Sequence, residues 1–277
     1  MEKKERRIVF STGLLMLLIF TFTDLQISNA LFTKNLYGRI FEVIGELPFV
    51  FLSLFGSILL FRFRSKKNRV LNLLTVLLSG VMMVLFLLMG GFMTLNYLRD
   101  NVGEVPKFVA FLIAAVLLAG AIFLARKVPE EYAYPAVTYG IIAMVYFILV
   151  IIIMNSLKTV WGRMRLREMT DPVLEFTRWY VIINRGGFEN IYASFPSGHS
   201  MNSAAIILLT LLPSFVPMLE GKEKLLKGIA YTWTIIVGLS RIVMGAHFAS
   251  DVTVGILLSF AIFDITRTVV CKLRNRV

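Results

Sequence analysis

The sequence predicts an all-α, polytopic transmembrane helix bundle, and three observations support this prediction. Apolar residues make up 57% of the 277-residue chain, and its mean hydropathy is +0.78. Only 17% of the residues are charged, whereas a soluble domain would carry about a quarter. The third observation is a series of apolar runs, most of them close to the ~20 residues that a helix needs to cross a bilayer. Composition therefore excludes a single soluble domain and a disordered chain.

About eight candidate spans follow one another along the chain. They lie near residues 8–27, 47–61, 70–98, 108–125, 135–157, 199–219, 228–246 and 251–270. The first follows a charged start typical of a signal peptide, but no small-residue cleavage site comes after it. We therefore expect a retained helix that ends near the polar residue Asp24.

The remaining features of the first half concern packing rather than chemistry. The second run is short, and Asn29–Glu46 before it is expected to lie along the membrane interface as an amphipathic segment. The Gly90-Gly91 pair in the third run indicates close packing between helices. Because the chain has no internal repeat and no low-complexity segment, we predict a single integral membrane domain over residues 1–277.

The chain carries 29 Lys and Arg against 17 Asp and Glu, a net charge of +12. In a membrane protein this excess indicates basic loops facing anionic lipid, so we expect no nucleic-acid partner. Eighteen of the 29 basic residues fall in five clusters, at 3–7, 62–69, 126–127, 222–227 and 267–276. The positive-inside rule then predicts both termini in the cytoplasm. The compact loops indicate a bacterial plasma membrane protein.

Both histidines of the chain lie in polar stretches that this topology places on the extracytoplasmic side. One stretch begins at Lys158 and continues to Ser200, and the other runs from Ser240 to Asp251. Cationic side chains at membrane depth are costly and usually face a partner or a wet cavity. The sole cysteine, Cys271, excludes an internal disulfide and a cysteine-based zinc cluster.

The spacing within these stretches predicts a shared site. His247 and Asp251 are four residues apart, so on a helix they would share a face, and the carboxylate would hold the imidazole in one tautomer. Lys158 and Arg165 are seven apart and can project toward one side. His199 closes a Pro-Ser-Gly-His segment at the start of a span, where free backbone N–H groups favour an anion.

Together, these groups suit phosphoryl transfer without a metal or cofactor. Arginine and lysine neutralise the equatorial oxygens, one histidine attacks phosphorus and the other protonates the leaving oxygen. The extracytoplasmic loops contain no obvious cluster of carboxylates for a metal. Four further arginines are expected at solvated or headgroup positions, one of them lining the entrance: Arg163, Arg167, Arg178 and Arg185.

These residues resemble the signature of the type 2 phosphatidic acid phosphatase and vanadium haloperoxidase superfamily, specifically its membrane lipid phosphatase branch. Its three motifs are K-x6-R-P, P-S-G-H and S-R-x5-H-x3-D. Here they read Lys158-x6-Arg165, Pro196-Ser-Gly-His199 and Ser240-Arg241-x5-His247-x3-Asp251. The resemblance covers about residues 150–270 and departs from the family only at Leu166, which stands where the family has proline. It implies six core helices, to which this chain adds N-terminal helices.

The resemblance also implies a role for each matched position. His247 would be the nucleophile that forms a phospho-histidine, Asp251 would orient it, and His199 would be the general acid. The remaining matched residues would bind the substrate phosphate: Lys158, Arg165, Ser197, Gly198 and Arg241. Leu166 removes a residue with a fixed φ after Arg165, which raises the question of how rigidly that arginine is aimed.

The sequence thus predicts a lipid phosphatase embedded in the bilayer, with its site at the extracytoplasmic surface. The resemblance suggests undecaprenyl diphosphate, phosphatidylglycerol phosphate, phosphatidate or lipid A as substrate, and the first two are favoured because both can present phosphate on the outer face. A lipid phosphotransferase that uses the same histidine is one alternative. A vanadate-dependent peroxidase and a non-catalytic lipid-binding or transport protein are the others. The oligomeric state is left open.

Overall fold

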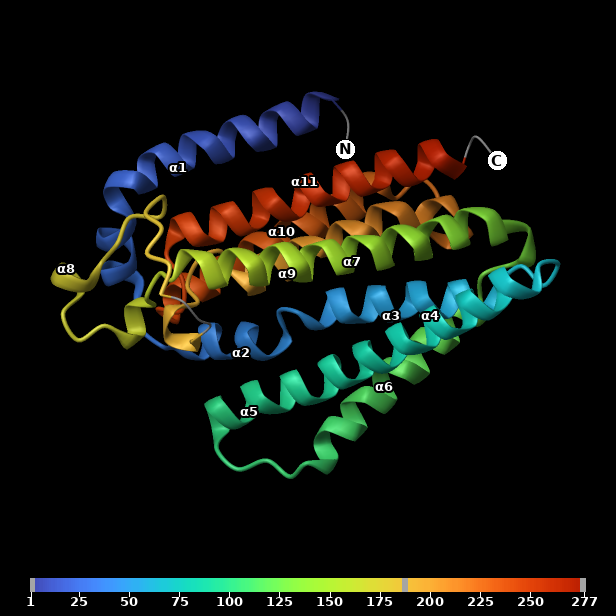
Figure 1. Cartoon of the computed structure of the whole chain (residues 1–277), viewed down its shortest axis with the longest axis horizontal. Helices are drawn as coiled ribbons and strands as arrows, with labels where there is room; N and C mark the ends of the chain where they lie inside the picture. The colour runs from blue at the N-terminus through green and yellow to red at the C-terminus, as the bar shows by residue number, and fades with distance from the viewer. Residues whose placement is uncertain (1–2, 186–188, 275–277) are drawn as a thin grey trace. The chain divides into compact units, whose positions relative to one another are not determined.

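The computed structural model describes residues 3–185 and 189–274, and within these ranges the regular secondary structure is entirely helical (Figure 1). The last residues of the basic tail, 275–277, lie outside the described ranges. The α-helices are α1 (Lys3–Leu31), α2 (Leu36–Ile44), α3 (Leu47–Arg62), α4 (Arg69–Leu88), α5 (Thr94–Val102), α6 (Phe108–Arg126), α7 (Ala133–Trp161), α8 (Pro172–Glu175), α9 (Gly198–Ala204), α10 (Glu223–Val243) and α11 (Ala249–Arg274). The predicted all-α class is confirmed.

Seven helical segments within the described ranges are long and apolar enough to cross a membrane. They are Lys3–Leu31, Leu36–Arg62, Arg69–Val102, Phe108–Arg126, Glu130–Trp161, Glu223–Val243 and Ala249–Arg274. They coincide with seven of the eight apolar runs in the sequence and indicate an integral membrane protein. The segment expected to lie along the interface instead contains α2, which begins the second of these helices.

The eighth run, expected near 199–219, takes a different form. It begins as α9 and continues as a 3₁₀-helix over Ala205–Ser214, with Pro213 inside it. Proline lacks the N–H that an α-helix would use at that point. Bonds from i to i+3 keep the other backbone groups satisfied. The run is therefore helical but not one long α-helix.

The chain forms two compact units, each made of several segments. Unit 1 consists of Met1–Gly45, Leu149–Ala205 and Tyr231–Asp264. Unit 2 consists of Glu46–Ile148, Ile206–Ala230 and Ile265–Val277. All eight of the predicted site residues belong to unit 1, which also contains α1 and α2.

Unit 2 confirms the close packing predicted for the glycine pair. Gly90 and Gly91 lie in a π-helical turn, Met89–Met93, between α4 and α5. A Cβ atom at Gly91 would come within 2.5 Å of the backbone oxygen of Ala110 on α6. Only a residue without a side chain allows this approach between the two helices.

We expect Gly91→Ala to destabilise the protein, because its new methyl group meets backbone that cannot move aside; overpacking of this kind costs about 1–3 kcal/mol. Gly80→Ala on α4 is the matched control, since a Cβ there meets nothing within 4 Å, and alanine favours a helix over glycine by about 1 kcal/mol. Thermal unfolding in detergent should therefore show a lower midpoint for Gly91→Ala and an unchanged or higher one for Gly80→Ala. Equal midpoints would contradict the packing.

Candidate active site

The predicted site residues lie at the ends of α7, α9, α10 and α11 that belong to unit 1, and in the adjoining loops. Lys158 lies in the last turn of α7, and Arg165 follows in the loop. Ser197 is the N-cap of α9, whose first residues are Gly198 and His199. The third motif lies where α10 gives way to α11: Arg241 in the last turn of α10, His247 in the connecting loop and Asp251 in the first turn of α11.

The second motif brings the start of α9 against the end of α7. The Ser197 hydroxyl caps α9 by accepting the Ser200 N–H at 3.3 Å, and the Ser197 N–H donates to the backbone oxygen of Asp251 at 3.0 Å. A Cβ on Gly198 would lie 3.4 Å from Nζ of Lys158 and 2.9 Å from Sδ of Met154. Glycine at this position therefore lets the ammonium group of the first motif approach the backbone of the second.

His247 is oriented differently from the prediction. The residue lies before α11 rather than on it, so the expected helical i,i+4 pairing with Asp251 does not form. Instead, Nδ1 of His247 donates to the backbone oxygen of Ser194 at 2.5 Å. A carbonyl oxygen can only accept, so the proton is on Nδ1 and the lone pair of the neutral ring is on Nε2.

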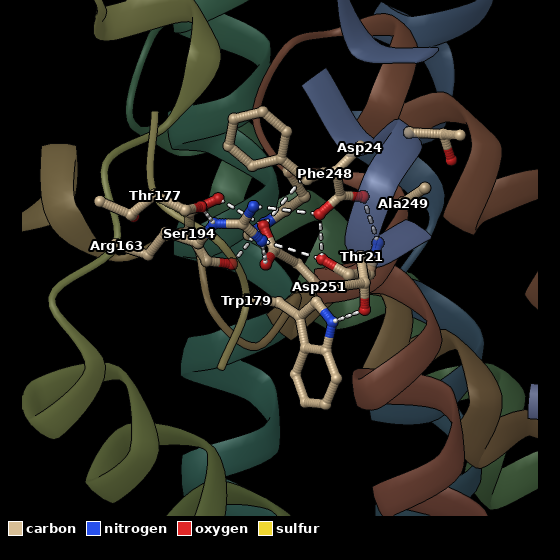
Figure 2. A network of polar contacts seen from close by, with 12 residues as sticks. Thr21, Asp24, Arg163, Thr177, Trp179, Ser194, Phe248, Ala249 and Asp251 are labelled. Carbon is tan, nitrogen blue, oxygen red and sulfur yellow. Dashed lines mark hydrogen bonds and ion pairs between the residues drawn. The ribbon is translucent and has the colours of Figure 1, made fainter. Parts of the chain in front are cut away.

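The Asp251 carboxylate bonds to Ser194, the residue whose backbone oxygen accepts Nδ1 of His247. Figure 2 shows Asp251 close to Ser194 and Arg163. The carboxylate of Asp251 accepts the Ser194 hydroxyl at 2.6 Å, the Phe248 N–H at 2.9 Å and Nη1 of Arg163 at 2.5 Å. Ser194 therefore links Asp251 to the imidazole of His247.

The structure contradicts the solvated position expected for Arg163. Its side chain is fully buried and pairs with two carboxylates, those of Asp24 and Asp251. Sequence reasoning assigned Asp24 only to the polar end of the first span. No local spacing could have indicated this pairing, because Asp24 and Arg163 are 139 positions apart.

A second buried carboxylate near the candidate site, Glu42 of α2, was not predicted from the sequence. It accepts Nη1 of Arg241 at 3.1 Å and Nη1 of Arg167 at 3.4 Å, and its backbone oxygen accepts Nε2 of His199 at 3.1 Å. Arg167 was expected at a solvated position, but its side chain is only 21% exposed. The α2 segment therefore contributes directly to the site.

Arg165 is held firmly although Leu166 replaces the family's proline. Its backbone N–H donates to the backbone oxygen of Ile191 at 3.0 Å, and its Nη2 donates to the side-chain oxygen of Asn190 at 2.9 Å. Leu166 is itself buried and begins a 3₁₀ turn. Hydrogen bonds to Asn190 and Ile191 thus anchor both the backbone and the guanidinium of Arg165 where the family has a proline next to it.

The two imidazoles and the cations affect one another electrostatically. Burial lowers the pKa of His247 well below its ordinary value, and the charges of Arg165 and Lys158 lower it further. The positive charges of Arg241, Lys158 and Arg165 also disfavour a positive charge on His199. His247 is therefore neutral at neutral pH, the state in which Nε2 can act as a nucleophile.

Comparison with known proteins agrees with the motif pattern. Residues 139–274 match the family model of the PAP2 superfamily. A curated relative, phosphatidylglycerophosphatase B of Bacillus subtilis (strain 168), is 37% identical over 76 residues, which are 27% of this chain and 37% of that protein. No solved structure matches the chain. The part of this chain that is similar to the PAP2 superfamily, residues 139–274, contains all three motifs.

Proposed function

We propose that this protein is a membrane lipid phosphatase that hydrolyses a phosphate monoester or diphosphate through a phospho-histidine. One observation carries the proposal: unit 1 brings His247 and His199 together with three motif cations, close enough for the charges of these groups to influence one another. The PAP2 match and the name of the curated relative support the same class of activity. Among the described residues, no cluster of three His, Cys, Asp or Glu side chains could hold a metal ion.

In the first step, Nε2 of His247 attacks phosphorus, and the bond from phosphorus to the leaving oxygen breaks. The negative charge of the bound substrate phosphate favours the protonated form of His199. This form donates a proton to that oxygen, so the alcohol leaves neutral, or the shortened phosphate leaves with that oxygen protonated. Lys158, Arg165 and Arg241 stabilise the charge that spreads over the three equatorial oxygens. The product of this step is a phosphoryl group on Nε2 and a neutral His199.

In the second step, a water molecule attacks the phospho-histidine. His199 accepts a proton from the water, the bond from phosphorus to Nε2 breaks, and inorganic phosphate leaves. His199 is then protonated again and His247 is neutral, so the site returns to its starting state. A phosphotransferase would differ only here, because a lipid hydroxyl would take the place of water.

The proposed substrate lies with its tail in the bilayer while its headgroup enters the cationic site. The positive-inside argument places both termini in the cytoplasm, which requires the eighth run, between α7 and α10, to cross the membrane as well. The ends of α7 and α10 and the starts of α9 and α11 then lie on the extracytoplasmic side. Phosphatidylglycerol phosphate is the first candidate, because the similar B. subtilis protein bears that activity in its name. Undecaprenyl diphosphate and phosphatidate follow.

The direct test is phosphate release by the purified protein in detergent, without added metal, from these three lipids. We expect release from at least one of them and the same rate with EDTA present. Strong inhibition by EDTA would contradict the metal-independent mechanism. No release by folded protein from any of the three, with or without an added diacylglycerol as phosphoryl acceptor, would contradict the phosphatase and favour a non-catalytic lipid-binding protein. Phosphate appearing on the added lipid would favour the phosphotransferase.

The lowered pKa of His247 predicts the acid side of the pH profile. The nucleophile is competent when neutral, that is, above its pKa, so kcat/KM should persist below the ordinary histidine value of about 6.5 before it falls. Lys158→Met removes one of the charges that lower this pKa. In that variant, the remaining activity should decline at a higher pH than in the wild type. A profile whose acid side does not move would contradict the electrostatic coupling of Lys158 to His247.

A further inference from the structure

The first transmembrane helix reaches the active site through one buried carboxylate. Asp24 lies on α1, outside residues 139–274 that match the PAP2 family, and is only 2% exposed. It accepts Nη2 of Arg163 at 3.0 Å and the Ser250 N–H at 2.9 Å, and it also accepts the Ser250 hydroxyl. Figure 2 shows Asp24 and Asp251 close to the guanidinium group of Arg163.

Arg163 is held from several sides, so its guanidinium has one position. It stacks over the ring of Phe248, 4.1 Å from the centroid, and its Nε donates to the backbone oxygen of Thr177 at 2.9 Å. Its Nη1 donates to the Ser250 hydroxyl at 2.9 Å and to Asp251 at 2.5 Å. A planar guanidinium with five fixed donors suits such a bridge between two carboxylates, and lysine would not.

Arg163 contacts Ser194 directly through its backbone and indirectly through Asp251. Its own backbone oxygen accepts the Ser194 N–H at 3.0 Å, and the carboxylate that it holds, Asp251, accepts the Ser194 hydroxyl at 2.6 Å. The carbonyl group of Ser194 is in turn the acceptor for Nδ1 of His247. A continuous chain of contacts thus joins Asp24, Arg163, Asp251 and Ser194 to the imidazole.

We propose that Asp24 and Arg163 are positioning residues for His247, so that α1 completes the active site of the proposed phosphatase. Asp24 supplies the second carboxylate that keeps Arg163 centred. Arg163 then keeps Asp251 and the Ser194 carbonyl group in place, which fixes both the tautomer and the direction of Nε2. Loss of either residue should slow the chemical step without weakening substrate binding, since neither belongs to the proposed phosphate-binding groups.

The test rests on the proposed function and uses the full-length protein in detergent with the best lipid of the panel. Asp24→Asn keeps the shape of the side chain and removes its charge, and Ser194→Ala removes the hydroxyl bond to Asp251 but keeps the carbonyl group. Each should lower kcat by about 10- to 100-fold, as expected for a group that orients a functional histidine, with KM within about twofold. The double variant should be no slower than the worse single one, because both changes break the same chain.

Thr21→Val is the matched control on the same helix. The Thr21 hydroxyl accepts Nε1 of Trp179 at 3.0 Å. This bond also joins α1 to the segment between α8 and α9, but it is not part of the chain of contacts from Asp24 to His247. This variant should keep the wild-type kcat. If it loses as much kcat as Asp24→Asn, or if the losses of the Asp24 and Ser194 variants multiply, anchoring of α1 rather than positioning of His247 explains the effect, and the proposal is overturned.

Ser250→Ala keeps the test decisive if Asp24→Asn does not fold. It removes a hydroxyl bonded to both Asp24 and Arg163 while leaving every charge in place. Normal kcat in folded Ser250→Ala and folded Ser194→Ala would overturn the proposal, whereas a lowered kcat at constant KM in both would support it. A wild type without phosphatase activity would instead refute the proposed function, so the two failures are distinguishable.

Discussion

Replacing His247 by alanine is expected to lower phosphate release by about 10⁴-fold or more, the scale seen when a covalent nucleophile is removed. The reason is that Nε2 of this ring is the atom proposed to bond to phosphorus, and no water can take over its position with the same orientation. The measurement is phosphate release from the best lipid of the panel. The variant should also form no labelled phosphoprotein when the labelled lipid is mixed with enzyme and quenched rapidly.

Folding must be shown to be intact for this result to count. Tyr180→Phe serves as the control, because the tyrosine is 46% exposed and its hydroxyl accepts Nη1 of the surface residue Arg178. Both variants should insert into membranes and, after purification in detergent, elute from a size-exclusion column at the same volume as the wild type. Turnover by His247→Ala within tenfold of the control would remove this residue as the nucleophile.

Arg241→Ala is expected to have two separate effects, one on catalysis and one on stability. Loss of a cation that stabilises the transferred phosphoryl group should lower kcat/KM by about 10²–10³-fold. The same change takes away a guanidinium that lies 3.1 Å from the buried carboxylate of Glu42. Breaking a buried ion pair from one side costs 3–5 kcal/mol, and we expect about 3 kcal/mol because Nη1 of Arg167 also lies near Glu42.

A double variant separates the two effects. Adding Glu42→Gln to Arg241→Ala removes the buried negative charge, so the thermal midpoint should recover most of its loss. Activity should stay low, because the phosphate-binding cation is still missing. Recovery of activity together with stability would show that Arg241 serves only to balance Glu42 and does not bind the phosphate.

Features that depend on local composition and spacing could be predicted from the amino-acid sequence alone. Seven of the eight apolar runs became membrane-length helices, because the length and apolarity of a run are enough to predict a span. The three motifs also identified the PAP2 superfamily, because their residue types and intervals form an ordered pattern. The form of the run near 199–219 was less predictable, since Pro213 lies within an otherwise uniform apolar stretch.

The pairing of the buried charges could not be predicted in this way, because it depends on the packing of distant segments. Asp24 pairs with Arg163 across 139 positions, and Glu42 pairs with Arg241 across 199. Helix periodicity relates residues only a few positions apart, so it cannot bring together the end of α1, the start of α2 and the catalytic half of the chain. For the same reason, the spacing of His247 and Asp251 suggested a direct bond, whereas the loop before α11 turns the imidazole to Ser194. The motifs identify the candidate reactive groups, whereas packing between distant segments determines which residues contact and orient them.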